Sequence, residues 1–175
     1  PARGRRCRRA CPTDALRLIV DVMRALELKI PPPIVALLVA FAMWCVSRYA
    51  SAQAAPELVR VPLAIVLAVV GLAFDVSGFV AFRRARTTIN PMKPRSASAM
   101  VDSGIYRVTR NPMYVGLFFM LLAWAAFLGS WWVLPGPFAF AAYLRRFQIA
   151  PEEDALASLF GADYLSYKSR VRRWL

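Results

Sequence analysis

The sequence predicts an all-α, polytopic membrane protein with four transmembrane helices, the last two forming a helical hairpin, and a cytoplasmic C-terminal helical segment. Hydrophobic residues make up 59% of the 175 residues, and yet the formal net charge is +13. A soluble domain does not usually combine so much apolar mass with so much basic charge. The apolar and the basic residues must therefore occupy separate segments of the chain.

The apolar residues are concentrated in stretches long enough to cross a bilayer, which takes about 20 helical residues. The four stretches are residues 30–49, 61–82, 112–128 and 131–147. Only Gly129 and Ser130 separate the last two, which predicts a tight helical hairpin. Trp131 and Trp132 would anchor its turn among lipid headgroups, where tryptophan is enriched.

The basic residues predict the orientation of these helices. All but two of the 23 Lys and Arg lie in residues 1–32, 83–110 and 145–175, and only Arg48 and Arg60 flank the loop of the first apolar hairpin. Because basic residues accumulate on the cytoplasmic side of a membrane, these three segments and both termini are expected there. We expect the basic segments to interact with anionic lipid headgroups. Nucleic acid is not an expected partner.

The first 29 residues form a separate region, a basic tail followed by a segment with helical hydrophobic spacing. Leu16, Ile19, Met23 and Leu26 repeat on one helix face after an arginine-rich start. One interpretation is an amphipathic helix lying on the membrane surface. An equally good interpretation is that the residues before Met23 are an upstream extension of a shorter natural chain that begins at Met23. Residues 30–175 form the membrane domain.

Two residue types limit the chemistry that this chain can perform. Histidine is absent, which removes the commonest general base and the commonest metal ligand. The three cysteines are Cys7, Cys11 and Cys45, and a single C-x3-C pair does not make a metal site. No metal is therefore expected.

Two polar clusters lie at the expected cytoplasmic ends of the helices. Asn111 and Pro112 are typical of a helix start, where they cap it, but free N–H groups there also suit a ligand carboxylate, with Arg110 as a second anion contact. In the second cluster, Glu152 and Glu153 complement the dipole of a helix opening at residue 151. They could instead accept hydrogen bonds from a ligand.

Asp75 is the only acid within the four apolar stretches. Intramembrane acids are candidates for function, since burying a carboxylate in lipid is costly. The structural alternative is that Asp75 pairs with an arginine such as Arg83, or forms a hydrogen bond across an interface of small residues. Both interpretations remain open from the sequence.

Two motifs at a characteristic separation carry a family resemblance. G-I-Y-R-V-T-R-N-P-M-Y-V-G begins at Gly104, and P-E-E-D-A-L-A-S-L-F-G-A-D-Y-L-S-Y-K-S-R-V begins at Pro151, with a helical hairpin between them. This arrangement resembles the isoprenylcysteine carboxyl methyltransferase family of integral membrane enzymes. The stretch T-T-I-N-P-M-K-P at residues 87–94 resembles its bacterial branch, which implies the inner membrane of a bacterium. The resemblance covers about residues 23–175.

The resemblance implies S-adenosylmethionine as cofactor, with S-adenosylhomocysteine as product, in a cytoplasmic site made by residues 83–111 and 148–175. The cofactor contacts that it implies are Ser98, Ala99, Met100, Val101, Tyr106, Asn111, Pro112, Met113, Tyr114 and Glu152. Glu153 is added as the paired neighbour of Glu152. The predicted catalytic residues are Arg110, Asn111, Tyr114 and Arg146.

Two departures from the family pattern concern the acceptor. Asn111 stands where the eukaryotic enzymes have histidine, and Gln148 stands where an arginine is thought to meet the substrate carboxylate. Arg145 and Arg146 could supply that charge from one turn away.

The predicted function is transfer of a methyl group to a lipophilic acceptor, either a small molecule or a lipidated substrate, with a carboxylate as one acceptor. The alternatives are a phospholipid amine N-methyltransferase and a non-catalytic membrane adaptor. In the enzyme, Tyr106 or Tyr114 could hold the sulfonium over a ring face.

Overall fold

The computed structural model describes residues 28–49, 56–85 and 101–175, and within these ranges the protein is helical apart from one isolated bridge between Thr109 and Arg172. The predicted N-terminal helix and the predicted contacts Ser98, Ala99 and Met100 lie outside the described residues. The elements in chain order are α2 (Pro32–Tyr49), α3 (Glu57–Ala85), η2 (Gly104–Arg107), α4 (Pro112–Leu128), η3 (Trp131–Val133), α5 (Pro135–Leu144), η4 (Arg145–Ile149) and α6 (Ala150–Arg170).

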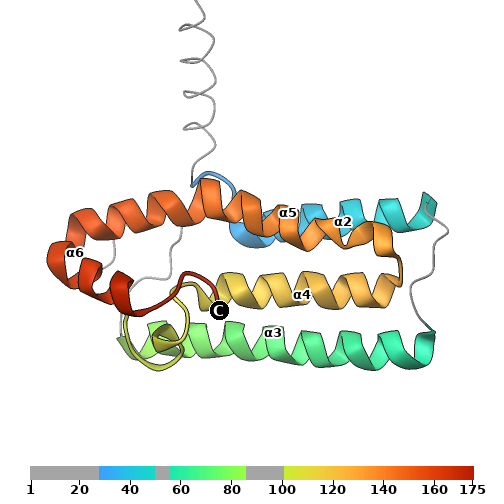
Figure 1. The fold of residues 1–175 in the computed structure, drawn as a ribbon, viewed down its shortest axis with the longest axis horizontal. Helices are drawn as coiled ribbons and strands as arrows, with labels where there is room; N and C mark the ends of the chain where they lie inside the picture. Colours follow the sequence, from blue (N-terminus) through green and yellow to red (C-terminus); the bar gives the residue numbers. More distant parts are fainter. Residues whose placement is uncertain (1–27, 50–55, 86–100) are drawn as a thin grey trace, which may run out of the picture.

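The helices α2 to α5 run alternately in opposite directions, and α4 lies between the others (Figure 1). Its most extensive packing is against α3, and α2 and α5 pack together on its other side. The core on that second side is formed by apolar side chains such as Phe140 and Leu144, both fully buried. The starts of α2 and α4 therefore share one end of the bundle with the ends of α3 and α5.

Two of these helices have the length and the hydropathy of membrane spans. They are α2, with 18 residues, and α3, with 29 residues. The next apolar helix, α4, has 17 residues and begins and ends where the sequence predicted. Large apolar side chains such as Leu37 and Ile65 are exposed on the outer faces of α2 and α3, which suits contact with lipid chains.

The turn between α4 and α5 has the predicted position, with Gly129 in the left-handed conformation (φ 65°) that favours glycine after a helix. Trp131 and Trp132 are exposed beside it. Arg60, near the start of α3, donates a hydrogen bond to the carbonyl of Phe127. Its positive charge lies at the C-terminal end of α4, where the helix dipole is negative. This contact is a structural reason for an arginine at the end of the bundle that carries few basic residues.

Glycine residues allow α3 and α4 to approach closely. A Cβ atom placed on Gly71 would lie 2.9 Å from the Gly116 carbonyl oxygen, and one on Gly78 would lie 2.9 Å from Cγ of Met113. A Cβ atom on Gly116 would overlap the carboxylate of Asp75. Asp75 therefore faces the backbone of α4, and within the described residues it forms no ion pair with Arg83.

This contact predicts that Gly116→Ala destabilises the protein, because the new methyl group must displace either the Asp75 side chain or a whole helix. Overpacking of this kind costs about 1–3 kcal/mol. The measurement is the unfolding midpoint of purified protein in detergent micelles. The double variant Gly116→Ala/Asp75→Ala is the control, since it removes the overlapping carboxylate. If the double variant is no more stable than Gly116→Ala, the loss does not come from this contact.

The fourth apolar stretch differs from the prediction at its C-terminal end. A separate helix was expected to open at Pro151, but α5 continues through the π-helical turn η4 into α6 without a break. Gly161 forms a kink within α6, where it adopts φ 53° and ψ −124°, and the helix then resumes. Beyond the kink α6 turns back toward the start of α4 (Figure 1).

Candidate active site at the end of the bundle

Four segments meet where α4 begins: the loop containing η2, the start of α4, the helix from η4 into α6, and residues 171–175 after α6 (Figure 1). Their meeting depends on the kink at Gly161, which reverses the second half of α6. This conformation lies outside the regions that residues with a side chain readily adopt. The sequence thus brings the two predicted motifs together through one glycine.

Residues 171–175 are bound to the loop that precedes α4. The Arg110 N–H donates to the carbonyl of Arg172 over 2.9 Å, and the Thr109 hydroxyl and the Asn111 side-chain amide donate to the carbonyl of Arg173 over 3.2 and 3.0 Å. Trp174 packs against the apolar core. This pairing corrects one prediction: Pro112 begins α4 as expected, but the side chain of Asn111 does not cap the helix.

Glu153 connects α6 to both of these segments through ion pairs. Its carboxylate receives two hydrogen bonds from Arg173, of 2.9 and 2.7 Å, and lies 3.2 Å from Nη1 of Arg110 and 3.1 Å from Nζ of Lys168. The side chain is only 5% exposed. Burial alone would raise its pKa, but the bonds from Arg173 and Lys168 and the charge of Arg110 hold the pKa below its usual value. Glu153 therefore remains ionised and holds the end of the bundle together.

Arg173 joins the C-terminal residues to α6. Its guanidinium binds Glu153 in a bidentate geometry, which is the strongest arrangement of an arginine and a carboxylate. The sequence separates the two residues by 20 positions and a kink, so no local pattern signals the pair.

A second acid, Glu152, lies in a different environment one residue earlier. Its Oε1 atom accepts a hydrogen bond of 2.6 Å from the Tyr114 hydroxyl and another of 3.0 Å from the Gln148 amide. No arginine or lysine among the described residues forms an ion pair with it. Burial raises the pKa of Glu152 to about 7, although both hydrogen bonds act against the rise. Glu152 can therefore gain or lose a proton near neutral pH.

Gln148 is a candidate site residue that the predicted set omitted. It is 2% exposed and lies in the π-helical turn η4, four residues before Glu152. Residues four apart share a helix face, and single π turns are frequent at functional sites. The spacing could have identified the pair, because an amide at this position can donate to the acid.

Tyrosines lie near both acids, with Tyr106 and Tyr114 near Glu152 and Tyr164 near Glu153. Tyr106 is buried against the edge of Phe82, and its carbonyl accepts a hydrogen bond of 2.7 Å from the Tyr167 hydroxyl. Burial raises the pKa of Tyr106, and the charge of nearby Glu152 raises it further. Burial likewise raises the pKa of Tyr164 to about 12. These hydroxyls stay protonated at neutral pH and act as hydrogen-bond donors and aromatic surfaces.

The structure gathers only part of the predicted residue set around Glu152. Tyr114 and Tyr106 lie near its carboxylate. Pro112 and Met113 face Gly78 of α3, and the Arg146 guanidinium lies over the Phe147 ring at 5.5 Å. Val101 is partly exposed beside the loop that leads to η2. The first three residues of that cofactor segment lie outside the described ranges.

Arg110 is the remaining predicted catalytic residue, and it has unused hydrogen-bonding capacity. Its side chain is 10% exposed, and its Nε and Nη1 atoms are buried without a hydrogen-bond partner in the described part of the chain. Nη1 lies close enough to the Glu153 carboxylate for an ion pair, but the two groups do not form a hydrogen bond. Buried N–H groups of this kind can bind an anionic group of a ligand.

Comparison with known families identifies the domain that contains this site. Residues 59–163 match the phospholipid methyltransferase family. The chain belongs to the phospholipid methyltransferase family. The matched residues run from α3 to the kink of α6 and include Tyr114, Gln148, Glu152 and Glu153. The expectation of an integral membrane methyltransferase is thereby confirmed, and the protein is a membrane methyltransferase.

One curated relative matches part of the chain. It is an uncharacterized protein of Haemophilus influenzae (strain ATCC 51907 / DSM 11121 / KW20 / Rd), 46% identical over 63 residues, which are 36% of this chain and 100% of the relative. No solved structure matches the chain. The family match ends before Tyr164, so Tyr167, Lys168 and Arg173 of the candidate site lie beyond the matched region.

Proposed function

We propose that this chain transfers a methyl group from S-adenosylmethionine to the amine of a membrane phospholipid, at the cytoplasmic face of a bacterial inner membrane. The observation that carries the proposal is Glu152, a carboxylate without a cationic partner among the described residues and bonded to Tyr114 and Gln148. Such a group attracts a cation, and both a sulfonium and an ammonium are cations. The family membership supports the same reaction class.

The residues at this site fit the proposed cofactor. Glu152 and the rings of Tyr106 and Tyr114 suit a positively charged sulfur, and the unused donors of Arg110 suit an anionic group of the ligand. S-adenosylmethionine, when bound, supplies the methyl group as an electrophile. The side chains have to align the acceptor with that group and keep water out.

Glu152 is also suited to the proton transfer that an amine acceptor requires. A phospholipid ammonium must lose a proton before its nitrogen can attack, and a base with a pKa of about 7 can accept that proton near neutral pH. Tyr114 and Gln148 hold the receiving oxygen in place through their hydrogen bonds. No histidine is needed for this step.

Transfer to a carboxylate, as in the isoprenylcysteine carboxyl methyltransferases, is the second candidate. The buried N–H groups of Arg110 favour it, because they could bind the acceptor carboxylate. Gln148 argues against it, since it occupies the position of the substrate-binding arginine and donates to Glu152. The amine is therefore preferred.

We further propose that α4 and the continuous helix through α5 also cross the membrane, which gives four spans with both termini in the cytoplasm. The alternating directions of α2 to α5 support this arrangement. So do the basic residues, since the loop containing η2 and the end of α6 carry them at the same end of the bundle.

The reaction can be tested by incubating membranes that contain the protein with methyl-labelled cofactor and separating labelled lipid from labelled protein. Label that resists base and migrates with an N-methylated phospholipid is expected. Base-labile label would indicate a methyl ester and overturn the amine assignment. Absence of label, together with no saturable binding of S-adenosylhomocysteine, would indicate the adaptor.

The pKa of Glu152 predicts how cofactor preference changes with pH. S-adenosylmethionine and S-adenosylhomocysteine differ by one methyl group and a positive charge, so only the first should gain affinity as Glu152 ionises. Because the acid loses its proton around pH 7, the preference for S-adenosylmethionine should rise about fivefold between pH 6 and pH 8. Calorimetric titration of both ligands measures it. Glu152→Gln should abolish the rise, and an unchanged rise would exclude Glu152 as its source.

A further inference from the structure

The second half of α6 and the five residues that follow it lie over the polar end of the bundle, and we call residues 162–175 the C-terminal cover. The cover begins after the kink at Gly161 and turns back toward the start of α4 (Figure 1). All but its first two residues lie beyond the region that matches the phospholipid methyltransferase family, which ends at residue 163. The family match therefore assigns no role to this segment.

The cover buries the N–H groups of Arg110 that were identified above as donors for a ligand anion. The Arg110 side chain is 10% exposed, and its Nε and Nη1 atoms are buried. Tyr164 of the cover is 3% exposed and interacts with the Arg110 guanidinium. Arg173 of the cover binds the same carboxylate as Arg110, that of Glu153. In this conformation a ligand anion cannot reach these donors, so the cover has to move for Arg110 to bind one.

Polar contacts hold the cover in place. Lys168 and Arg173 both form ion pairs with Glu153, which lies in the first half of α6. The Tyr167 hydroxyl donates a hydrogen bond of 2.7 Å to the Tyr106 carbonyl. Water offers the same groups alternative hydrogen bonds, so contacts of this kind can break and form again at modest cost.

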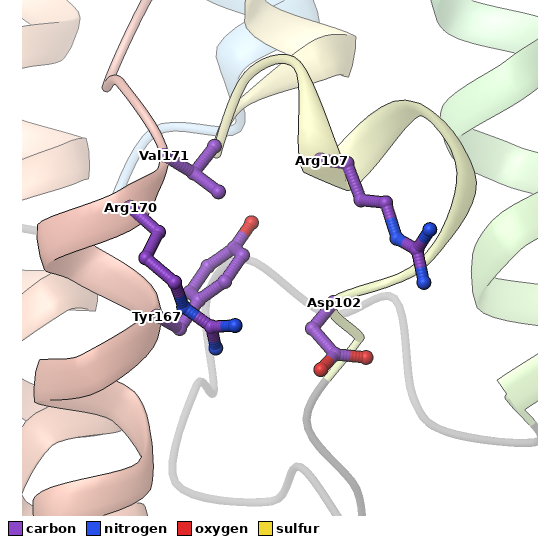
Figure 2. A pocket seen from close by; sticks show the side chains of 5 residues that line it. All are labelled: Asp102, Arg107, Tyr167, Arg170 and Val171. Carbon is purple, nitrogen blue, oxygen red and sulfur yellow. The ribbon is translucent and has the colours of Figure 1, made fainter.

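A hollow separates part of the cover from the loop that contains η2. Its volume is about 260 Å³, and it lies between Asp102 and Arg107 of the loop and Tyr167, Arg170 and Val171 of the cover (Figure 2). Figure 2 shows that Tyr167 extends from α6 toward the loop, whereas Arg107 points away from the cover. The cover is therefore joined to the loop at Tyr167 but is not packed against it along its whole edge.

Gly161 has the properties of a hinge for this segment. It adopts φ 53° and ψ −124°, which residues with a side chain rarely do. A Cβ atom on Gly161 would meet no side chain and no distant backbone atom of the described residues within 4 Å. Glycine is thus required here by the backbone conformation and not by packing. Hinges are commonly a few positions that absorb a large change in backbone angles, and an unpacked position can do so freely.

We propose that the C-terminal cover opens about Gly161 to admit a ligand to Arg110 and then closes over it, with Glu153 as the latch. In the closed protein, Glu153 holds both Arg110 and the cover. An anionic group that binds Arg110 competes with Glu153 for the same guanidinium. The identity of the ligand rests on the proposed function, whereas the opening does not and can be measured without ligand.

Hydrogen exchange of the full chain in detergent micelles measures the opening. The Arg110 N–H donates to the Arg172 carbonyl of the cover and should exchange when the cover opens. Leu121, which is 3% exposed in the middle of α4, is the reference for global unfolding. The protection factor of Arg110 should be at least about tenfold lower than that of Leu121, because a local opening requires less free energy. Equal protection factors would overturn the proposal.

The variant Gly161→Ala tests the hinge, since its methyl group has room but disfavours the kinked backbone of the closed state. It should lower the protection factor of Arg110 about 5- to 150-fold. Gly129→Ala is the matched control, because Gly129 has φ 65° at the other end of the bundle. Its strain persists when the cover opens, so it should lower the protection of Leu121 and leave that of Arg110 unchanged. If Gly161→Ala leaves Arg110 unchanged, the opening does not involve this hinge and the proposal fails.

A reversible cross-link tests whether the opening admits a ligand. Thr109 and Arg172 are bridge partners, so Thr109→Cys/Arg172→Cys should form a disulfide that locks the cover. The native Cys7, Cys11 and Cys45 are first replaced by alanine. The oxidised pair should bind S-adenosylhomocysteine at least about tenfold more slowly, and reduction should restore the rate.

Arg172→Cys alone is the control for this experiment, because it loses the same arginine and cannot form the cross-link. Binding by the oxidised pair at the rate of the reduced pair would overturn the proposal. If the reduced pair and the wild type both fail to bind S-adenosylhomocysteine, the proposed function fails, and the exchange of Arg110 still decides whether the cover opens.

Discussion

Replacing Glu153 with alanine should lower the free energy of unfolding by about 3 kcal/mol, because it leaves three cations without their shared anion in a largely buried position. Most of this destabilisation should come from Arg110, whose side chain is 10% exposed, and less from Lys168, whose side chain is 39% exposed and can be solvated by water. Residues 171–175 should detach from the loop before α4. Chemical unfolding in micelles and hydrogen exchange of the Arg110 amide measure the two effects.

Asp154→Ala is the matched control for this experiment, since Asp154 is the next acid along α6 and is exposed. It should change stability by only a few tenths of a kcal/mol. Lowering the pH should act in the same direction as Glu153→Ala. The pKa of Glu153 is held below its ordinary value, so its stabilisation is present above that value and disappears as the carboxylate is protonated. If Arg110 exchanges equally slowly in the wild type and the variant, the ion pairs do not hold the segment.

Replacing Glu152 with alanine should weaken cofactor binding about 10- to 150-fold while the protein stays inserted in the membrane. The reason is that a charge-assisted hydrogen bond contributes roughly 1.5–3 kcal/mol. The internal partners of Glu152 are two neutral groups, Tyr114 and Gln148, and no described cation is left unpaired by its removal. Titration with S-adenosylmethionine measures the loss.

The same control separates this effect from a general change in charge. Asp154→Ala removes one negative charge two residues away and should leave the affinity unchanged. Glu152→Gln should retain part of the hydrogen bonding and bind S-adenosylhomocysteine better than Glu152→Ala does. Normal cofactor affinity in a folded Glu152→Ala protein would assign the residue to the structure of the helix start.

The sequence predicted the features of the fold that depend on local chemistry. The bounds of α4 followed from Asn111, Pro112 and Gly129, whose backbone preferences act over one turn. The continuity of α5 and α6 could not be predicted in this way. Pro151 normally signals a helix start, but here the preceding π turn keeps the chain helical through it.

The sequence predicted that the two motifs meet in one site. It did not predict the hydrogen-bond partners of individual side chains, because those partners come from distant parts of the chain. Asn111 was expected to cap α4, but its amide binds the Arg173 carbonyl from 62 residues away. Glu152 and Glu153 form one acidic pair in the sequence, and the structure gives them opposite environments. Adjacent residues on a helix point about 100° apart, so their neighbours are set by the tertiary structure.

The π turn η4 makes the site tolerant of a deletion at one place in the chain. A π turn holds one residue more than an α-helical turn, so a chain with one residue fewer between 145 and 149 can form an α-helical turn there and keep the direction in which α6 faces. The residue equivalent to Glu152 would still face Tyr114, and the residue equivalent to Glu153 would still face its cations. A relative one residue shorter here must therefore be aligned with a gap at the π turn, so that each of its two acids is compared with the acid in the same environment.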